Sequence, residues 1–460
     1  MVGPEISINP RASGPIDSKI FMRKSMKRLS ILLMSIAVLC FFFPFQASAQ
    51  PHYTLKELCR IANETAETIK LAEEDEYIAE QEKQRALSVL VPRATLYGAH
   101  LNYKNNDDSY SPDTNTLSAL LTQSFTLNGR ELIAYDISKQ GIELAQFSKE
   151  AIRDEYIFQV AQAYIRTLSS KRLVDVADAD VERLTAHRNS VREKLSVGNV
   201  TKTDLYRAEA ELSRAKTDQI VAVNDVDTAK ANIVRLVGIE DVFTVSADDI
   251  DRQEGFTITE PEIRQRALKN RYEIKEARKS IEIAEKTVRY EKGDYWPSLD
   301  LEGGYRERTY EYESSGNDVE FDTEDLYVQA ELTFTLYDGG LRKAEVRQAM
   351  ADVRKAKLAL ASEEKAIILE SKESYLEYET AKNALINLAD EVKSAQENYT
   401  AVQMQFKYGM ADSVDIMDAN TLLVDAERRM SNAEYTYYLA ILRIIYTQGD
   451  IMPQLVADGA

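Results

Sequence analysis

One helical pattern occurs twice in this chain, and the two copies share one register. In each copy, apolar or small residues recur at alternating three- and four-residue steps, which indicates one stripe of a supercoiled helix. A glycine turn follows each stripe, at Gly198 and at Gly409, 211 positions later (409 − 198). The first stripe contains Val174, Ala177, Val181, Leu184, Val191 and Leu195, and the second contains Leu385, Leu388, Val392, Ala395, Val402 and Phe406. Two long helical hairpins therefore form the frame of the fold.

The composition suits long helices. Only 17 of the 460 residues are glycine and 10 are proline, whereas 44% are apolar and 29% are charged. The net charge of −19 makes the chain a poor candidate for binding nucleic acid.

Residues 1–49 are predicted to be a leader that contains a secretory signal. The signal has a basic region at residues 23–28, an apolar region from Leu29 to Phe43, and a small-residue cleavage site at Ala47-Ser48-Ala49. The apolar run is shorter than the ~20 residues that a membrane helix needs. The first 21 residues fit neither signal nor fold, so the start is placed at Met22 or Met26.

Removal of this leader leaves 51 basic and 74 acidic residues, a net charge of −23. Cys40 leaves with the signal and Cys59 remains alone, so no intrachain disulfide is expected. Leu39 precedes Cys40 where a lipoprotein signal requires a small residue, which argues against a lipid anchor.

Residues 50–238 are predicted to be the first structural repeat. A helix from Thr54 to about Leu90 ends before Pro92. Two strands separated by a polar loop, 104–116, follow, because the apolar period changes from 3.6 to 2. A long helix from about Arg130 to Leu195, the turn and a return helix complete the repeat. The predicted apolar faces hold Tyr97, Ala99, Leu101 and Tyr103 in one strand, and Leu117, Ala119, Leu121, Phe125 and Leu127 in the other.

The second half repeats this order after an acidic connector, 239–260. The second repeat spans 261–449 and precedes a tail, 450–460. It contains a helix from Glu262 to about Tyr290, a strand at 299–306, a polar loop at 307–325, a strand at 326–336 and a long helix to Phe406. The expected fold is mainly α, with a small β part for a membrane.

The strands favour membrane insertion of several copies. Each has roughly 9–11 residues and is long enough to cross a bilayer at a tilt. Four strands cannot close a barrel, and open edges are not viable in lipid, so two copies would give eight strands and three would give twelve. Asp300, Glu302 and Glu331 on the polar face would be costly in a packed interior, which favours three copies around a wide aqueous lumen. Alternation alone also fits a soluble sheet with one face on a core.

The two turns carry further polar residues. Gly198-Asn199-Val200 corresponds to Gly409-Met410-Ala411, and each glycine suits the left-handed residue that ends a helix. Thr201 with Asp204, and Asp412 with Asp415, resemble capping boxes that open the next helix. Asp418 lies three residues after Asp415 and shares its helix face, whereas the repeat equivalent of Asp418 is Arg207.

An enzyme is not indicated. His52, His100 and His187 lie on three different elements, and the chain contains no phosphate-binding loop or zinc motif. Gly339-Gly340 at a strand-to-helix junction is interpreted as a bend. We expect no catalytic residues, no metal site and no cofactor.

The ordered, duplicated set of motifs resembles the outer membrane factor family of TolC-like channel proteins across residues 52–449. The resemblance rests on the helix start at 54–58, the helix-to-strand junctions at Pro92 and Pro297, the segment Leu336-Tyr337-Asp338-Gly339-Gly340, and both turns of the form Gly-x5-Asp.

This resemblance implies a homotrimer with a 12-stranded barrel in the outer membrane and an α-helical barrel in the periplasm. Such a duct exports drugs, metals or proteins with a periplasmic adaptor and an inner-membrane transporter. The resemblance also implies that Asp204, Asp415 and Asp418 form the constriction at the periplasmic entrance and that both turns dock on the adaptor. Some members have an arginine where this chain has Ala411, so their polar latch is missing here or rebuilt, with Arg207 as a candidate.

A soluble periplasmic scaffold or adaptor is the alternative. An adaptor would combine one hairpin with lipoyl-like and β-barrel segments, and this chain has neither. The sequence does not identify the exported cargo.

Overall fold

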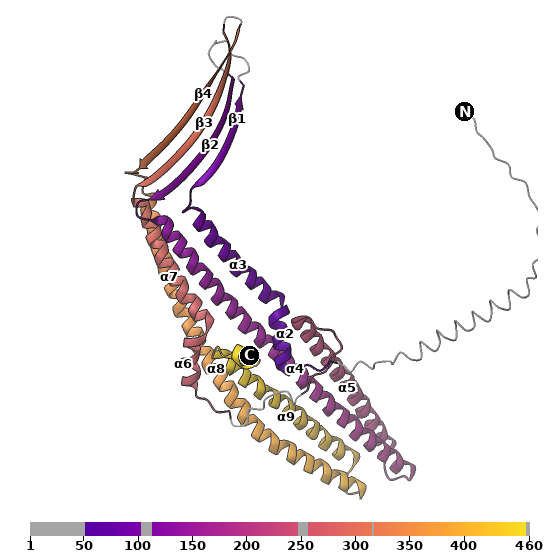
Figure 1. Ribbon diagram of the computed structural model, residues 1–460. Coiled ribbons are helices and arrows are strands. Elements are labelled where there is room, and N and C mark those ends of the chain that lie inside the picture. Colours follow the sequence, from indigo (N-terminus) through magenta and orange to yellow (C-terminus); the bar gives the residue numbers. More distant parts are fainter. Residues whose placement is uncertain (1–50, 103–112, 247–255, 315–316, 457–460) are drawn as a thin grey trace, which may run out of the picture. The chain divides into compact units, whose positions relative to one another are not determined.

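The computed structural model describes residues 51–102, 113–246, 256–314 and 317–456 (Figure 1). Residues from His52 onwards form one unit. The predicted leader, Tyr103, most of the loop 104–116, part of the connector and the end of the tail lie outside the described residues.

The two halves of the described chain have the same order of elements. The first half contains α2 (Leu55–Thr65), α3 (Glu67–Ser88), β1 (Arg93–Leu101), β2 (Asp113–Thr126), α4 (Arg130–Ser196) and α5 (Lys202–Val237). The second contains α6 (Glu260–Asn270), α7 (Tyr272–Lys292), the 3-10 turn η2 (Gly293–Tyr295), β3 (Ser298–Ser314), β4 (Asn317–Thr333), α8 (Leu341–Lys407) and α9 (Ser413–Thr447), and a short helix, α10 (Ile451–Leu455), follows. The fold is therefore mainly helical with one small sheet.

The long helices match the prediction. α4 and α8 each have 67 residues and are about 100 Å long at 1.5 Å per residue. A left-handed glycine precedes each of them, Gly129 for α4 and Gly340 for α8, which confirms the bend predicted at Gly339-Gly340. Among the described residues, no helix is both long and apolar enough to cross a membrane.

The helices before the strands are interrupted, which the sequence did not predict. The expected helix 54–90 breaks at Ala66, and the expected helix 262–290 breaks at Arg271; both residues have extended ψ values, of 126° and 131°. Tertiary contacts stabilise the breaks. The Thr65 hydroxyl donates to the carbonyl of Val237 in α5, and the Arg271 guanidinium donates to Glu370 in α8. Local propensity favours a helix at Ala66, so only these distant contacts reveal the break.

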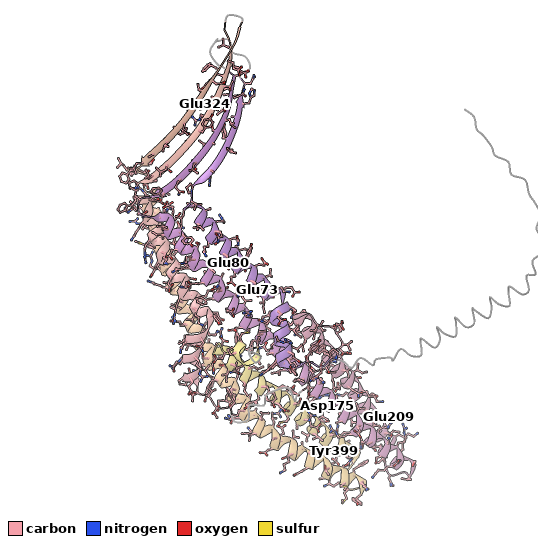
Figure 2. All side chains as sticks on the ribbon, viewed as in Figure 1. Glu73, Glu80, Asp175, Glu209, Glu324 and Tyr399 are labelled. Carbon is pink, nitrogen blue, oxygen red and sulfur yellow. The ribbon has the colours of Figure 1, made fainter. Side chains whose placement is uncertain are left out.

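The sheet is antiparallel, with the order β1-β2-β3-β4. β3 and β4 have 17 residues each, so the polar loop predicted at 307–325 is wrong: most of it is strand, including Glu324 of β4 (Figure 2). β2 likewise begins at Asp113, inside the predicted loop 104–116, and β4 ends at Thr333 rather than at 336. In the outer part of β3 and β4, Tyr310 and Phe321 lie on one face and Glu311 and Glu320 on the other, but the many charged residues there led to the prediction of a loop. Tyr310 and Phe321 stack there across the pair, with ring centres 4.7 Å apart.

The pairing register corrects the predicted face of β1. Leu96 pairs with Ala119 and Tyr97 pairs with Ser118, and directly opposed residues share one face of a sheet. Leu96 therefore belongs to the apolar face, and Tyr97, Ala99 and Leu101 belong to the polar face. β1 has large apolar residues on both faces, so alternation could not determine its orientation.

The apolar face of the sheet is uncovered within one chain. Leu96, Leu326 and Val328 are 84%, 85% and 88% exposed, whereas Ser118 on the opposite face is 2% exposed. The main core lies instead among the helices, where Leu58 (α2), Tyr164 (α4), Tyr378 (α8) and Ile444 (α9) are buried in one cluster. The exposed apolar face therefore requires another environment.

Candidate functional site at the helical turns

The two turns have the predicted geometry. Gly198 and Gly409 have φ values of +78° and +77°, in the left-handed region. After each glycine, an N–H closes back on the helix: that of Asn199 donates to Lys194 O at 2.9 Å, and that of Met410 donates to Gln405 O at 2.8 Å. These bonds satisfy carbonyls that the helix ends leave free. Asn199, Gly409 and Met410 are exposed, and Val200 and Ala411 are half-buried.

Both predicted capping boxes are present. Asp204 accepts hydrogen bonds from the Thr201 N–H and hydroxyl, at 2.8 and 2.7 Å, and Asp415 accepts from the Asp412 N–H at 2.8 Å. The backbone and side-chain hydrogen bonds from Thr201, together with the charge of Arg207, lower the pKa of Asp204. Asp204 and Asp415 therefore stabilise the starts of α5 and α9.

The predicted entrance carboxylates do not form a cluster within one chain. Asp415 and Asp418 are exposed on α9, and Asp204 is half-buried on α5. Among the described residues, no hydrogen bond or ion pair joins these three aspartates, and none joins Arg207 to the second turn. A shared site at these positions would therefore need several copies of the chain.

Side chains of α4 join the two hairpins close to the second turn. Lys194 Nζ donates to Phe406 O at 2.6 Å and lies 4.4 Å from the centre of the Phe406 ring. His187 Nε2 forms a 2.9 Å hydrogen bond with Ser413 Oγ, and its ring centre lies 5.3 Å from that of Phe406. Burial lowers the pKa of His187 to about 4, so the imidazole is neutral at pH 7.

These contacts were not predicted from the sequence, although the position of His187 indicated one of them. His187 lies between Leu184 and Val191 at steps of three and four, and so occupies a position of the apolar stripe. A polar residue at such a position is buried and needs a partner.

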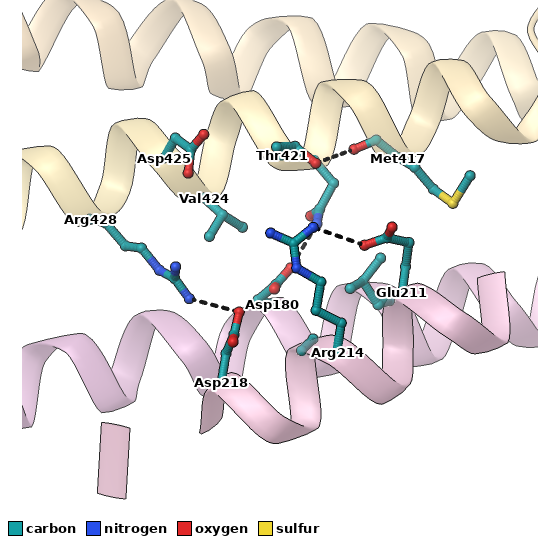
Figure 3. Close-up of a pocket in the computed structure, with 12 residues that line it drawn as sticks. Asp180, Glu211, Arg214, Asp218, Met417, Thr421, Val424, Asp425 and Arg428 are labelled. Atoms are coloured by element: carbon teal, nitrogen blue, oxygen red, sulfur yellow. Dashed lines mark hydrogen bonds and ion pairs between the residues drawn. The ribbon is translucent and has the colours of Figure 1, made fainter. Parts of the chain in front are cut away.

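A second polar contact lies further from the turns (Figure 3). Asn420 of α9 donates to buried Asp180 of α4 at 2.6 Å, and Arg183 donates to Asn420 at 3.0 Å and to Glu427 at 2.9 Å. Arg428 of α9 lies 3.5 Å from Asp218 of α5. Polar pairs thus join α9 to α4 and to α5.

The three carboxylates predicted for a lumen share the polar face of the sheet. Asp300 is directly opposite Glu331, and Glu302 is opposite Gln329. Tyr327 donates to Glu302 at 2.6 Å, and Ser124 of β2 donates to Asp300. The structure therefore brings Asp300, Glu302 and Glu331 together on the face opposite the exposed apolar residues.

One group of acidic residues close enough to share a cation occurs among the described residues, at Glu291, Asp294 and Glu345. Arg130 already pairs with Asp294 and with Glu291. This group is therefore interpreted as an ion-pair junction at the start of α4.

Comparison with solved structures identifies the fold. The outer membrane protein VceC of Vibrio cholerae superimposes with a TM-score of 0.72 at 16% identity, covering 86% of this chain and 96% of that chain. CusC superimposes with a TM-score of 0.75 at 14% identity, covering 89% and 96%. The fold is therefore that of outer membrane channels.

Comparison of sequences finds related outer membrane and secretion proteins. Residues 263–446 match the family model for outer membrane efflux proteins. The outer membrane protein TolC of Salmonella enteritidis is 24% identical over 447 residues, which cover 93% of this chain and 87% of that protein. The alkaline protease secretion protein AprF of Pseudomonas aeruginosa is 23% identical over 325 residues, covering 69% and 66%. These matches make the chain similar to the TolC-like outer membrane factor family over most of its length.

Proposed function

We propose that three copies of this chain form a passive duct, in which twelve strands make a barrel and six helical hairpins make a tube that continues it. The chain is an outer membrane channel protein of an efflux or secretion system, with its helical part in the periplasm. Its family consists of channel proteins, and we propose no catalytic activity for this member.

The observation that supports this proposal most strongly is the sheet. Its edge strands, β1 and β4, each pair with one strand only, and its exposed face carries Leu96, Leu326 and Val328. Unpaired edges are not tolerated in lipid, so pairing of β4 with β1 of another copy would satisfy both edges. Carboxylates on the opposite face favour a lumen wide enough for water, hence three copies rather than two.

The same exposed face counts against the alternative of a soluble periplasmic scaffold. A continuous apolar surface on a soluble chain would promote association. The long unpaired edge of β4 would have the same effect.

At the other end, we propose that Asp204, Asp415 and Asp418 of three copies surround the periplasmic entrance. Rings of carboxylates in a narrow pore favour cations. The exposed turns, with Met410 72% exposed, would then dock on a periplasmic adaptor that links the duct to an inner-membrane transporter.

The test is ion selectivity in planar lipid bilayers with the purified full chain. We expect cation-selective channels, and we expect Asp415→Asn and Asp418→Asn to lower the cation-to-anion permeability ratio. Asp425→Asn, on α9 but further from the turn, is the matched control. Unchanged selectivity in both variants would exclude these aspartates from the entrance, and absence of any channel in the wild type would refute the duct.

A further inference from the structure

The polar face of the sheet carries two bands of opposite charge. The acidic band, closer to the helices, consists of Asp300, Glu302 and Glu331. The arginine band consists of Arg306 and Arg308, which occupy alternate positions of β3 and therefore lie on the same face as Asp300. Arg308 lies eight residues (308 − 300) after Asp300, about 27 Å along an antiparallel strand. This separation exceeds the Debye length of about 10 Å at 0.1 M salt, so each band acts on ions separately.

The arginine band is positive although the whole chain has a net charge of −19. Asp325 of β4 is directly opposite Arg306 and lies on the same face. Neither Arg306 nor Arg308 forms an ion pair with any part of the chain that the structure describes. Glu307 lies between the two arginines but belongs to the other face, where Glu324 is directly opposite it. The two guanidinium groups are therefore available to anionic groups.

Tyr327 of β4 lies between the two bands. It is directly opposite Gly304, and its ring packs against the glycine so closely that a Cβ atom at Gly304 would lie 2.7 Å from the Tyr327 Cζ atom. The Tyr327 hydroxyl donates to Glu302 at 2.6 Å, and Arg306 donates to that hydroxyl at 3.3 Å. The guanidinium carbon of Arg306 lies 5.4 Å from the ring centre. Tyr327 thus contacts one residue of each band.

The close approach of the ring requires a glycine at position 304. A Cβ atom at the neighbouring Gly303 would meet no atom within 4 Å, and Gly303 lies on the other face, opposite Val328. A side chain at Gly304 would displace the Tyr327 ring from β3, and the ring would then project from the polar face. The glycine therefore keeps the ring against the sheet.

We propose that the polar face of the sheet is a second selectivity element of the duct, in which the arginine band binds multivalent anions and Tyr327, packed against Gly304, separates it from the acidic band. This inference rests on the proposed function, because it places the polar face around the lumen. Each of three copies would contribute two arginines to the part of the lumen farthest from the helices. Guanidinium groups bind phosphate oxygens through paired hydrogen bonds, so a polyphosphate has the fitting chemistry. The charge of this band is opposite to that of the proposed entrance.

The test measures block of channels of the full chain in planar bilayers by inorganic triphosphate at low salt, where screening is weak. Triphosphate added on the side of the strands should lower the wild-type conductance. The double substitution Arg306→Gln with Arg308→Gln should raise the concentration for half block roughly ten-fold, because two charged donors are lost. Arg306→Lys with Arg308→Lys should retain most of the block. Glu307→Gln, between the two arginines on the other face, is the matched control and should be blocked like the wild type.

A second pair of variants tests the packing of Tyr327. Gly304→Ala should displace the ring, lower the conductance and weaken the block by triphosphate, whereas Gly303→Ala should change neither. The proposal is refuted if triphosphate does not block conducting wild-type channels, if the Gln double variant is blocked like the wild type, or if Gly304→Ala behaves like Gly303→Ala. If the wild type forms no channel, the proposed function fails. Triphosphate binding to the detergent-solubilised protein that is lost in the Gln double variant would then still show that the arginine band binds anions.

Discussion

At the scale of single residues, one of the two helix breaks carries a buried charge. Arg271, at the break between α6 and α7, is buried, donates to Glu273 and Glu370, and stacks over the ring of Tyr446 with its guanidinium carbon 4.7 Å from the ring centre. A buried charge of this kind is stable only because it is paired and hydrogen-bonded. The residue that interrupts the helix thus also joins α7 to α8 and α9.

Asp154 of α4 lies close to Arg271 and has a raised pKa. Burial, and then the negative charges of Glu273 and Glu150, raise its pKa to about 7, against the opposing charges of Arg271 and Lys275. Because the folded-state pKa lies above the unfolded value of 3.8, the folded protein binds this proton more tightly. The stabilisation is complete below about pH 4 and is lost as the pH rises to about 7.

Asp154→Asn should therefore raise the melting temperature at pH 8 and change it little at pH 4. Each unit of separation between the two pKa values corresponds to about 1.4 kcal/mol, so the gain at pH 8 should be measurable by calorimetry. Asp175→Asn, on the same helix, is the control. Equal effects of Asp154→Asn at both pH values would show that Asp154 does not titrate in this range.

At the scale of elements, the long helices and turns that occur in both repeats were predicted from the sequence. The helix breaks, which depend on contacts between residues far apart in the sequence, were not. α4 and α8 ended within a residue or two of the predicted positions, because each stripe is long and stops at a glycine turn. The breaks at Ala66 and Arg271 depend on contacts with α5 and α8, and the local sequence does not indicate these contacts. The capping aspartates were predicted from spacing, whereas the contacts of His187 and Lys194 with the second hairpin depend on how the two hairpins pack together.

Substitutions at Leu96 and Tyr97, which lie on opposite faces of β1, test which face of the sheet meets lipid. If the sheet crosses the membrane with Leu96 toward lipid and Tyr97 toward the lumen, Leu96→Arg should cost roughly 2–4 kcal/mol, and less if Leu96 lies near an interface. Tyr97→Arg should cost much less because its side chain would reach water. The measurement is the yield of heat-modifiable, folded protein in the outer membrane. A larger loss with Tyr97→Arg than with Leu96→Arg would reverse the assigned faces.

At the scale of the whole molecule, the described helices share a main buried core and both turns are capped, but the sheet is incomplete within one chain. The sheet has two unpaired edges and an exposed apolar face. The sequence predicted this incompleteness from the number of strands, although it underestimated the lengths of β2, β3 and β4.

The proposed duct requires two further copies of the same chain to complete the sheet. Native mass spectrometry of the mature protein, extracted from the outer membrane in mild detergent, measures this number directly. We expect a particle of three chains that dissociates to single chains on heating. A single chain that remains in solution without detergent would contradict it, and a stable particle of two chains would contradict the twelve-stranded barrel.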